Sequence, residues 1–182
     1  VSNAEKTVIT LADGTENVVT DGPSYVFPDA ETDEPNAAIF SNDDLTINGS
    51  GTLTVNANYN NGIDSDDDLK ITGGNITVNA VNDGIKGRDS IAVLDGNIVV
   101  NAGGDGLQSN NDEDAEKGFV SIEGGSVVVT AVSDGIQAET ILSVNDGNLA
   151  IVSGGGSTTT ADSAKGLKAG IDITIAGGTI NI

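Results

Sequence analysis

The sequence predicts an all-β protein that winds into a right-handed parallel β-helix, a solenoid with three short strands in each coil. The first observation is a phrase of about 22 residues that occurs six times, and self-similarity at a fixed period is typical of a solenoid. The second observation is that apolar residues within each copy lie two apart, which is the period of a strand. Five copies open on a polar residue, a glycine and an aliphatic residue: Asn61-Gly62-Ile63, Asp83-Gly84-Ile85, Asp105-Gly106-Leu107, Asp134-Gly135-Ile136 and Lys165-Gly166-Leu167.

Each copy is expected to contain three strands separated by turns. In the second copy, Ile63 begins the first strand, Leu69 and Ile71 belong to the second, and Ile76 and Val78 belong to the third. Parallel stacking of the coils places equivalent residues in buried columns, and β-branched residues suit such a surface. The clearest columns are Leu53, Ile76, Ile98, Val127, Leu149 and Ile180, and Val55, Val78, Val100, Val129, Ile151 and Ile182. A β-sandwich is the alternative, and the regularity of these columns argues against it.

The turns and the two ends of the chain follow from the same repeat. Gly-Gly or Asp-Gly pairs precede the third strand, where a corner needs a positive φ; they are Gly73-Gly74, Asp95-Gly96, Gly124-Gly125, Asp146-Gly147 and Gly177-Gly178. Residues 1–36 are expected to form an N-terminal cap and a first imperfect coil, and residues 37–182 the regular repeats of a single domain. Because Ile182 ends within a coil, we expect a further segment or a partner to cover that strand edge.

The composition excludes several classes of function. The chain has 28 acidic and 7 basic residues, for a net charge of -21, and it lacks Cys, His, Met and Trp. Such a charge repels the phosphates of nucleic acid. No apolar run approaches the length of a membrane span, so membrane insertion is not expected. Without His and Cys, the usual zinc and haem sites are also excluded.

Aspartates at the turns are the candidates for a metal site. Neighbouring coils lie about 4.8 Å apart, and two stacked carboxylates repel by about 3.5 kcal/mol at an effective dielectric near 20. Calcium binds six to eight oxygens and would relieve that repulsion, whereas a single Asp is better explained as a turn former. One predicted outward column contains Asp83, Asp105 and Asp134 above Asn61, and a second contains Asp43, Asp67 and Asp89. The full set of predicted Ca²⁺ ligands is Asp43, Asp64, Asp66, Asp67, Asp68, Asp83, Asp89, Asp105, Asp112, Asp114 and Asp134.

A chemically mixed column is the candidate ligand surface. Its members each follow the first aliphatic residue of a copy and are expected to face outward: Phe40, Asp64, Lys86, Gln108, Gln137 and Lys168. A straight row of such groups can hydrogen-bond the hydroxyl and carboxylate groups of an extended polysaccharide; a solvated face is the alternative. Phe40 and Tyr59 are the candidates for stacking on sugar rings. The predicted ligand-binding residues are therefore Phe40, Tyr59, Lys86, Gln108, Gln137 and Lys168.

The Asp-Gly-Ile repeats, glycine corners and Asp-rich turns of residues 37–182 resemble the bacterial carbohydrate-binding β-helix domains of clostridial surface proteins. That family is similar in fold to polysaccharide lyases. The resemblance implies an extracellular or cell-surface protein with bound calcium, which binds plant cell-wall polysaccharides such as cellulose and polygalacturonate (pectin). The scarcity of aromatic residues, two Tyr and three Phe, leaves little for a flat cellulose-binding platform.

Two other functions remain as alternatives to non-catalytic binding. A calcium-dependent, pectate-lyase-like eliminase would use Arg88, Lys86 or Lys168 as the base. Arg88 is the only arginine of the chain, which leaves little positive charge to hold an anionic polymer. A structural or adhesive solenoid is the third interpretation. A β-helix glycosidase would pair two carboxylates, such as Asp105 and Asp134, but nothing distinguishes that pair from the other aspartates.

Overall fold

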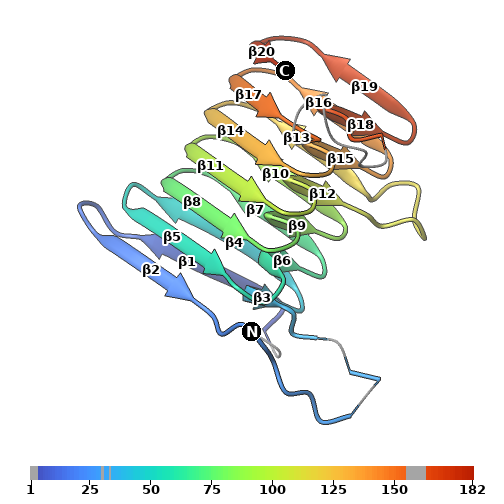
Figure 1. Cartoon of the computed structure of the whole chain (residues 1–182). Helices are drawn as coiled ribbons and strands as arrows, with labels where there is room; N and C mark the ends of the chain where they lie inside the picture. The colour runs from blue at the N-terminus through green and yellow to red at the C-terminus, as the bar shows by residue number, and fades with distance from the viewer. Residues whose placement is uncertain (1–3, 30, 33, 155–162) are drawn as a thin grey trace.

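The protein is a parallel β-helix, seen in a computed structural model that describes residues 4–29, 31–32, 34–154 and 163–182. Its coils stack from the N-terminal end to the C-terminal end (Figure 1). The strands form three parallel sheets, so the predicted fold class is confirmed. Within the described ranges no helix is long and apolar enough to cross a membrane.

The three sheets each take one strand from successive coils. Sheet A contains β1 (Lys6–Leu11), β4 (Asp44–Gly49), β7 (Asp68–Ile71), β10 (Ser90–Val93), β13 (Phe119–Ile122), β16 (Ile141–Val144) and β19 (Asp172–Ile175). Sheet B contains β2 (Glu16–Thr20), β5 (Thr52–Ala57), β8 (Asn75–Ala80), β11 (Asn97–Ala102), β14 (Ser126–Ala131), β17 (Asn148–Val152) and β20 (Thr179–Asn181). Sheet C contains β3 (Ala37–Ser41), β6 (Asn61–Ser65), β9 (Ile85–Gly87), β12 (Leu107–Ser109), β15 (Ile136–Ala138) and β18 (Leu167–Ala169).

The core is a stack of aliphatic residues enclosed by the three sheets. The predicted column from Leu53 to Ile180 is confirmed in register along sheet B. The second column is confirmed from Val55 to Ile151. Sheets A and C add their own columns, among them Leu45, Leu69 and Ile91. Because each residue packs on its counterpart in the next coil, the repeat in the sequence becomes one continuous hydrophobic core.

Glycines recur in each copy of the repeat for two different reasons. Gly96 has a φ of +121° at the corner before β11, a conformation that residues with a Cβ rarely adopt. Gly84, in contrast, lies where a Cβ would overlap the Val100 side chain and the carbonyl of Gly106. The glycine of each Asp-Gly-Ile phrase is thus required by close packing between coils, which brings the preceding Asp against the next coil.

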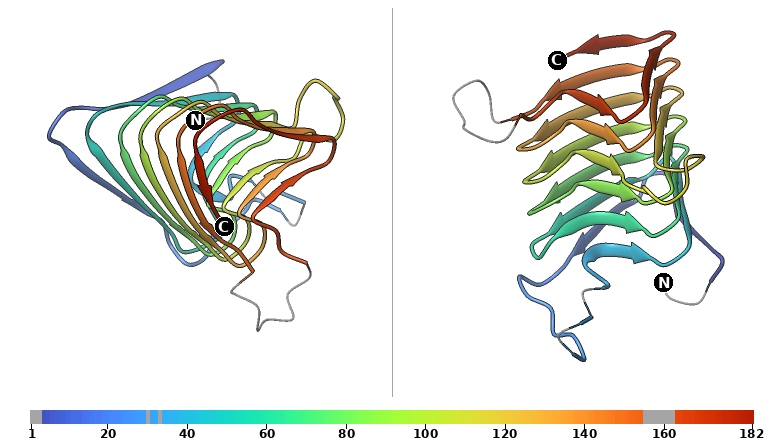
Figure 2. Two further views of the ribbon diagram at one scale, coloured as in Figure 1. Left: turned by 90° about the horizontal axis from the view of Figure 1, so that it is seen from above. Right: turned by 90° about the vertical axis from the view of Figure 1, so that its right-hand side faces the viewer.

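Two departures from the repeat alter the molecular surface. In the N-terminal region, β1 and β2 pair with β4 and β5, and the loop before β3 follows. Tyr25 of this loop stacks on Tyr59 with ring centroids 4.3 Å apart. Between β12 and β13, residues 110–118 form a loop that projects from one corner of the coils, shown in yellow in Figure 2. This loop brings Arg88 and Lys117 into contact with acidic groups, as described below.

Candidate functional site

The predicted column of Asp83, Asp105 and Asp134 is a buried ladder rather than an exposed row. These three residues are only 6–9% exposed, so the prediction that they face outward was wrong. Asp83 Oδ1 accepts a hydrogen bond from the backbone N–H of Asp105 at 2.8 Å, and Asp105 Oδ1 accepts one from Asp134 at 2.8 Å. Asp134 Oδ1 accepts one from Lys165 at 2.7 Å. We call these residues the aspartate ladder; each carboxylate satisfies a backbone donor of the next coil.

The second oxygens of the ladder contact the predicted ligand-binding column. Asp105 Oδ2 accepts a 2.6 Å hydrogen bond from the Gln108 amide, and Asp134 Oδ2 lies 2.9 Å from the Lys168 ammonium. Burial raises the pKa of Asp83 to about 6, although the hydrogen bond from Asp105 acts in the opposite direction. Burial also raises the pKa of Asp105. The ladder is therefore stabilised by neighbouring amide and ammonium groups of the chain itself.

The mixed column lies in register along sheet C, as predicted, and we call it the sheet C ridge. Phe40 pairs with Asp64, Asp64 with Lys86, and the register continues through Gln108 and Gln137 to Lys168. One prediction fails, because Asp64 is buried, with 1% of its surface exposed. Its Oδ2 accepts from the Asn61 amide at 2.8 Å and lies 3.6 Å from Lys86 Nζ. The ridge is therefore half-buried; Lys86 pairs with Asp64 within it, and Lys168 pairs with Asp134 of the aspartate ladder.

The second aspartate column, Asp43, Asp67 and Asp89, also forms an acidic cluster. Burial raises the pKa of Asp67, and repulsion from Asp89 and Asp43 adds to this effect. Lys117, from the loop after β12, approaches Asp89 Oδ2 to 2.7 Å. Burial raises the pKa of Asp89, but hydrogen bonds from Lys117 and Asn111 outweigh it, so the net pKa lies below the usual value. A cavity of about 350 Å³ lies here, lined by Asp44, Asp67, Asp68, Asp89, Asp114, Glu116, Lys117 and Phe119.

The three basic residues that an eliminase would use all lie beside carboxylates. Arg88 Nη2 lies 2.6 Å from Glu113 Oε2, and this hydrogen bond raises the pKa of Arg88. The hydrogen bond to Asp134 raises the pKa of Lys168. Lys86 lies against the buried Asp64. A general base must be deprotonated before it can act, so these contacts oppose the catalytic role.

The part of the chain that the structure describes contains no group of three or more His, Cys, Asp or Glu side chains arranged for a metal ion. Two buried acceptor atoms among the described residues nevertheless lack a hydrogen-bond donor. The buried oxygens Asp64 Oδ1 and Asn36 Oδ1 have no hydrogen-bond partner among the described residues. Asp66 lies near Asp64, and burial followed by repulsion from Glu34 and Asp64 raises its pKa to about 6. Among the predicted calcium ligands, Asp64 and Asp66 are therefore the pair that best fits a cation.

Comparison with known proteins identifies the family. A family model described as "Carbohydrate-binding domain-containing protein" matches residues 1–182. A protein of the same description from Acetivibrio thermocellus is 53% identical over 155 residues, which are 85% of this chain and 54% of that protein. This chain belongs to that family. It spans about half the length of this curated relative.

A solved structure of a related protein has the same fold. It is described as the polysaccharide lyase-like protein from C. thermocellum, gadolinium derivative, and it superimposes with a TM-score of 0.89 at 43% identity. The match covers 98% of this chain and 69% of the other. The family resemblance and the polysaccharide-lyase-like fold predicted from the repeats are confirmed.

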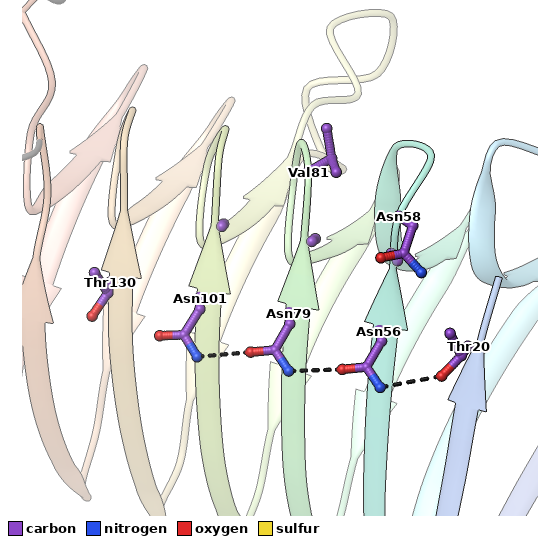
Figure 3. A pocket seen from close by; sticks show the side chains of 10 residues that line it. Thr20, Asn56, Asn58, Asn79, Val81, Asn101 and Thr130 are labelled. Atoms are coloured by element: carbon purple, nitrogen blue, oxygen red, sulfur yellow. Dashed lines mark hydrogen bonds between the residues drawn. The ribbon is translucent and has the colours of Figure 1, made fainter. Parts of the chain in front are cut away.

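A groove of about 660 Å³ on sheet B is a surface feature of this family member that was not predicted from the sequence. The groove is lined by Thr20, Asn56, Ala57, Asn58, Asn79, Ala80, Val81, Asn101, Ala102 and Thr130. Figure 3 shows Asn56, Asn79 and Asn101 side by side on successive strands. The signal in the sequence was the repeated Asn-Ala at the end of β5, β8 and β11, a pattern that gives no indication of a hollow surface.

Tyr59, one of the two residues predicted to stack on sugar rings, packs against other aromatic side chains. Tyr59 is stacked on Tyr25 with the rings inclined by 16°, and Phe27 lies 6.2 Å from Tyr25. These rings hold the N-terminal loop against the first coils, so at least one face of Tyr59 is covered. Tyr25 also donates a hydrogen bond to Asp21 at 2.8 Å, within the same segment between β2 and β3.

Proposed function

We propose that this protein is a non-catalytic module that binds an extended polysaccharide of the plant cell wall, such as cellulose or polygalacturonate. The family description supports a carbohydrate ligand. The straight solenoid also supports an elongated one, because it repeats its side chains at intervals of about 4.8 Å along its axis. Such polymers lie outside cells, so the proposal includes an extracellular or cell-surface location.

The pairing of every candidate base with a carboxylate is the observation that favours binding over cleavage. Elimination requires a base that removes the proton next to the uronate carboxylate. Arg88 and Lys168 are held as cations, with pKa values above the usual ones. The same ion pairs reduce the positive charge available to hold a polyanion. A lyase mechanism would need these contacts to break, whereas binding does not.

The proposal is tested by electrophoresis of the protein through native gels that contain a polysaccharide. We expect retardation by cellulose-type or polygalacturonate polymer without clearing of the polymer around the band. A protein of similar charge and size that binds no carbohydrate provides the control for sieving. Clearing would support the lyase alternative, with Arg88, Lys86 and Lys168 as the residues to replace. Migration unaffected by any of the polymers would contradict a carbohydrate-binding function.

We also propose that Asp64 and Asp66 bind a calcium ion. The unpartnered Oδ1 of Asp64 and the repulsion of Asp66 by Glu34 and Asp64 support this assignment. Carboxylate oxygens are hard ligands of the kind that Ca²⁺ prefers. A bound ion would also reduce the repulsion between this acidic protein and a uronate polymer, since it can contact carboxylates on both sides.

Calcium is expected to raise the melting temperature, because an ion that binds only the folded state stabilises it. At saturating calcium we expect an increase of about 5 °C over the value in EDTA. The Asp66→Asn variant should lose most of this increase. The control variant Asp95→Asn changes an exposed corner residue that is not part of the proposed site, so it should keep the full increase in melting temperature. Equal melting temperatures with calcium and with EDTA would rule out this site.

A further inference from the structure

The groove on sheet B is uncharged, although the protein has a net charge of -21. All ten residues that line it are Thr, Asn, Ala or Val. Its centre is a row of three asparagines at the end of β5, β8 and β11 (Figure 3). The row lies in strict register, since Asn56 pairs with Asn79 and Asn79 pairs with Asn101. We call these three residues the asparagine row.

The hydrogen bonds of the asparagine row leave more than half of its donors and acceptors unused. Asn101 donates to Asn79 Oδ1 at 2.9 Å, and Asn79 donates to Asn56 Oδ1 at 2.9 Å. Asn56 in turn donates to Thr20 Oγ1 at 3.1 Å. A side-chain amide has two N–H donors and two acceptor lone pairs. After these bonds, each of the three residues keeps one N–H and at least one lone pair for a ligand.

The fixed orientation of these amides favours a ligand with repeated hydroxyl groups. Each amide is oriented by its neighbours, so little side-chain entropy is lost when a ligand binds. The amides recur at about 4.8 Å, the spacing of adjacent strands, which is close to the length of one sugar in an extended chain. Val81 is 59% exposed at the edge of the groove and offers an apolar contact for the C–H face of a sugar ring.

We propose that this groove binds an extended neutral polysaccharide that runs across β5, β8 and β11, along the axis of the solenoid. The inference rests on the proposed carbohydrate-binding function and assigns it a surface separate from the sheet C ridge. Sugar hydroxyls would donate to the free lone pairs of the amides and accept from the free N–H groups. A polyuronate is disfavoured here, because the groove has no cation to oppose its carboxylates in a strongly acidic protein.

The test compares a double variant within the asparagine row, on β8 and β11, with a single variant elsewhere on β11. The double variant Asn79→Val/Asn101→Val removes two amides of the row, and valine is compatible with a strand. The control is Asn97→Val, which replaces an exposed Asn of β11 that lies outside the groove. Each protein is run in gels with hydroxyethyl cellulose as the neutral polymer and with polygalacturonate as the acidic one. Thermal unfolding of each variant checks that the coils remain intact.

We expect the double variant to bind hydroxyethyl cellulose about tenfold more weakly than the wild type, since several hydrogen bonds are lost. The Asn97→Val variant should bind it as the wild type does. Equal retention of the wild type and the double variant would overturn the groove assignment and leave the proposed function standing. Retention of the wild type by polygalacturonate alone would do the same. If neither polymer retains the wild type, both the groove assignment and the proposed function fail.

Discussion

Replacement of Asp105 by alanine is expected to lower the free energy of unfolding by about 3 kcal/mol, because it leaves buried hydrogen-bonding groups without partners. In the wild type, Asp105 Oδ1 accepts from the backbone N–H of Asp134 and Oδ2 accepts from the Gln108 amide. The backbone N–H of Asp134 is buried between two stacked coils, so loss of the carboxylate leaves this donor without its partner. Urea denaturation followed by circular dichroism measures the change.

Two controls separate the aspartate ladder from a calcium site. Asp105→Asn keeps an oxygen that can accept from Asp134 N–H, so we expect it to lose less than half as much stability as Asp105→Ala. Both measurements are made in EDTA. If Asp105 stabilised the protein only as a calcium ligand, Asp105→Ala would have no effect under these conditions. If Asp105 acts through the aspartate ladder, Asp105→Ala loses the full stability even without calcium.

The stability of the protein is expected to rise as the pH falls from about 7.5 to about 4.5. The pKa of Asp83 is raised from 3.8 to about 6 by burial, so the folded state binds this proton more tightly than the unfolded state. The resulting stabilisation is fully present below pH 3.8 and is lost as the pH rises through about 6. For a group that is almost fully buried, a pKa shift of this size changes the free energy of unfolding by about 2–3 kcal/mol.

Urea denaturation at several pH values, at constant ionic strength and in EDTA, measures this dependence. The Asp83→Asn variant removes the titrating group but keeps an acceptor for the Asp105 N–H, so its stability should vary less with pH over the same range. Asp112→Asn, on the exposed loop, is the matched control and should retain the wild-type profile. Loss of stability on acidification from pH 7 to pH 5 would contradict the burial of ionised Asp83.

The fold could be predicted from the sequence because its period is directly visible. Residues such as Ile76, Ile98 and Val127 alternate with polar neighbours, and stacking of successive copies puts them in one column. The role of the aspartate ladder could not be predicted in the same way. A carboxylate before a glycine can bind a metal or accept from a backbone N–H. The choice depends on which donors of the next coil are otherwise unpaired, and this is a property of the stacked structure.

The acidic cluster and the groove also have features that could not be predicted from the sequence. Lys117 reaches Asp89 from a loop that interrupts the repeat, so its position follows no period. The repeat therefore predicts that Asp67 and Asp89 lie together, but not that the Lys117 ammonium contacts Asp89. The asparagine row was visible as a repeat, yet the groove is also lined by residues that follow the strands, Asn58 after β5 and Val81 after β8.

Binding without cleavage is the central claim, and one incubation tests it most directly. The protein is mixed with cellulose and, separately, with polygalacturonate, each with calcium, and the protein retained on the polymer and the new chain ends are measured in the same tube. We predict retention on at least one polymer with no chain ends above the level of the protein-free control. New chain ends that increase with time and protein concentration, or absence of retention on both polymers, would contradict the account.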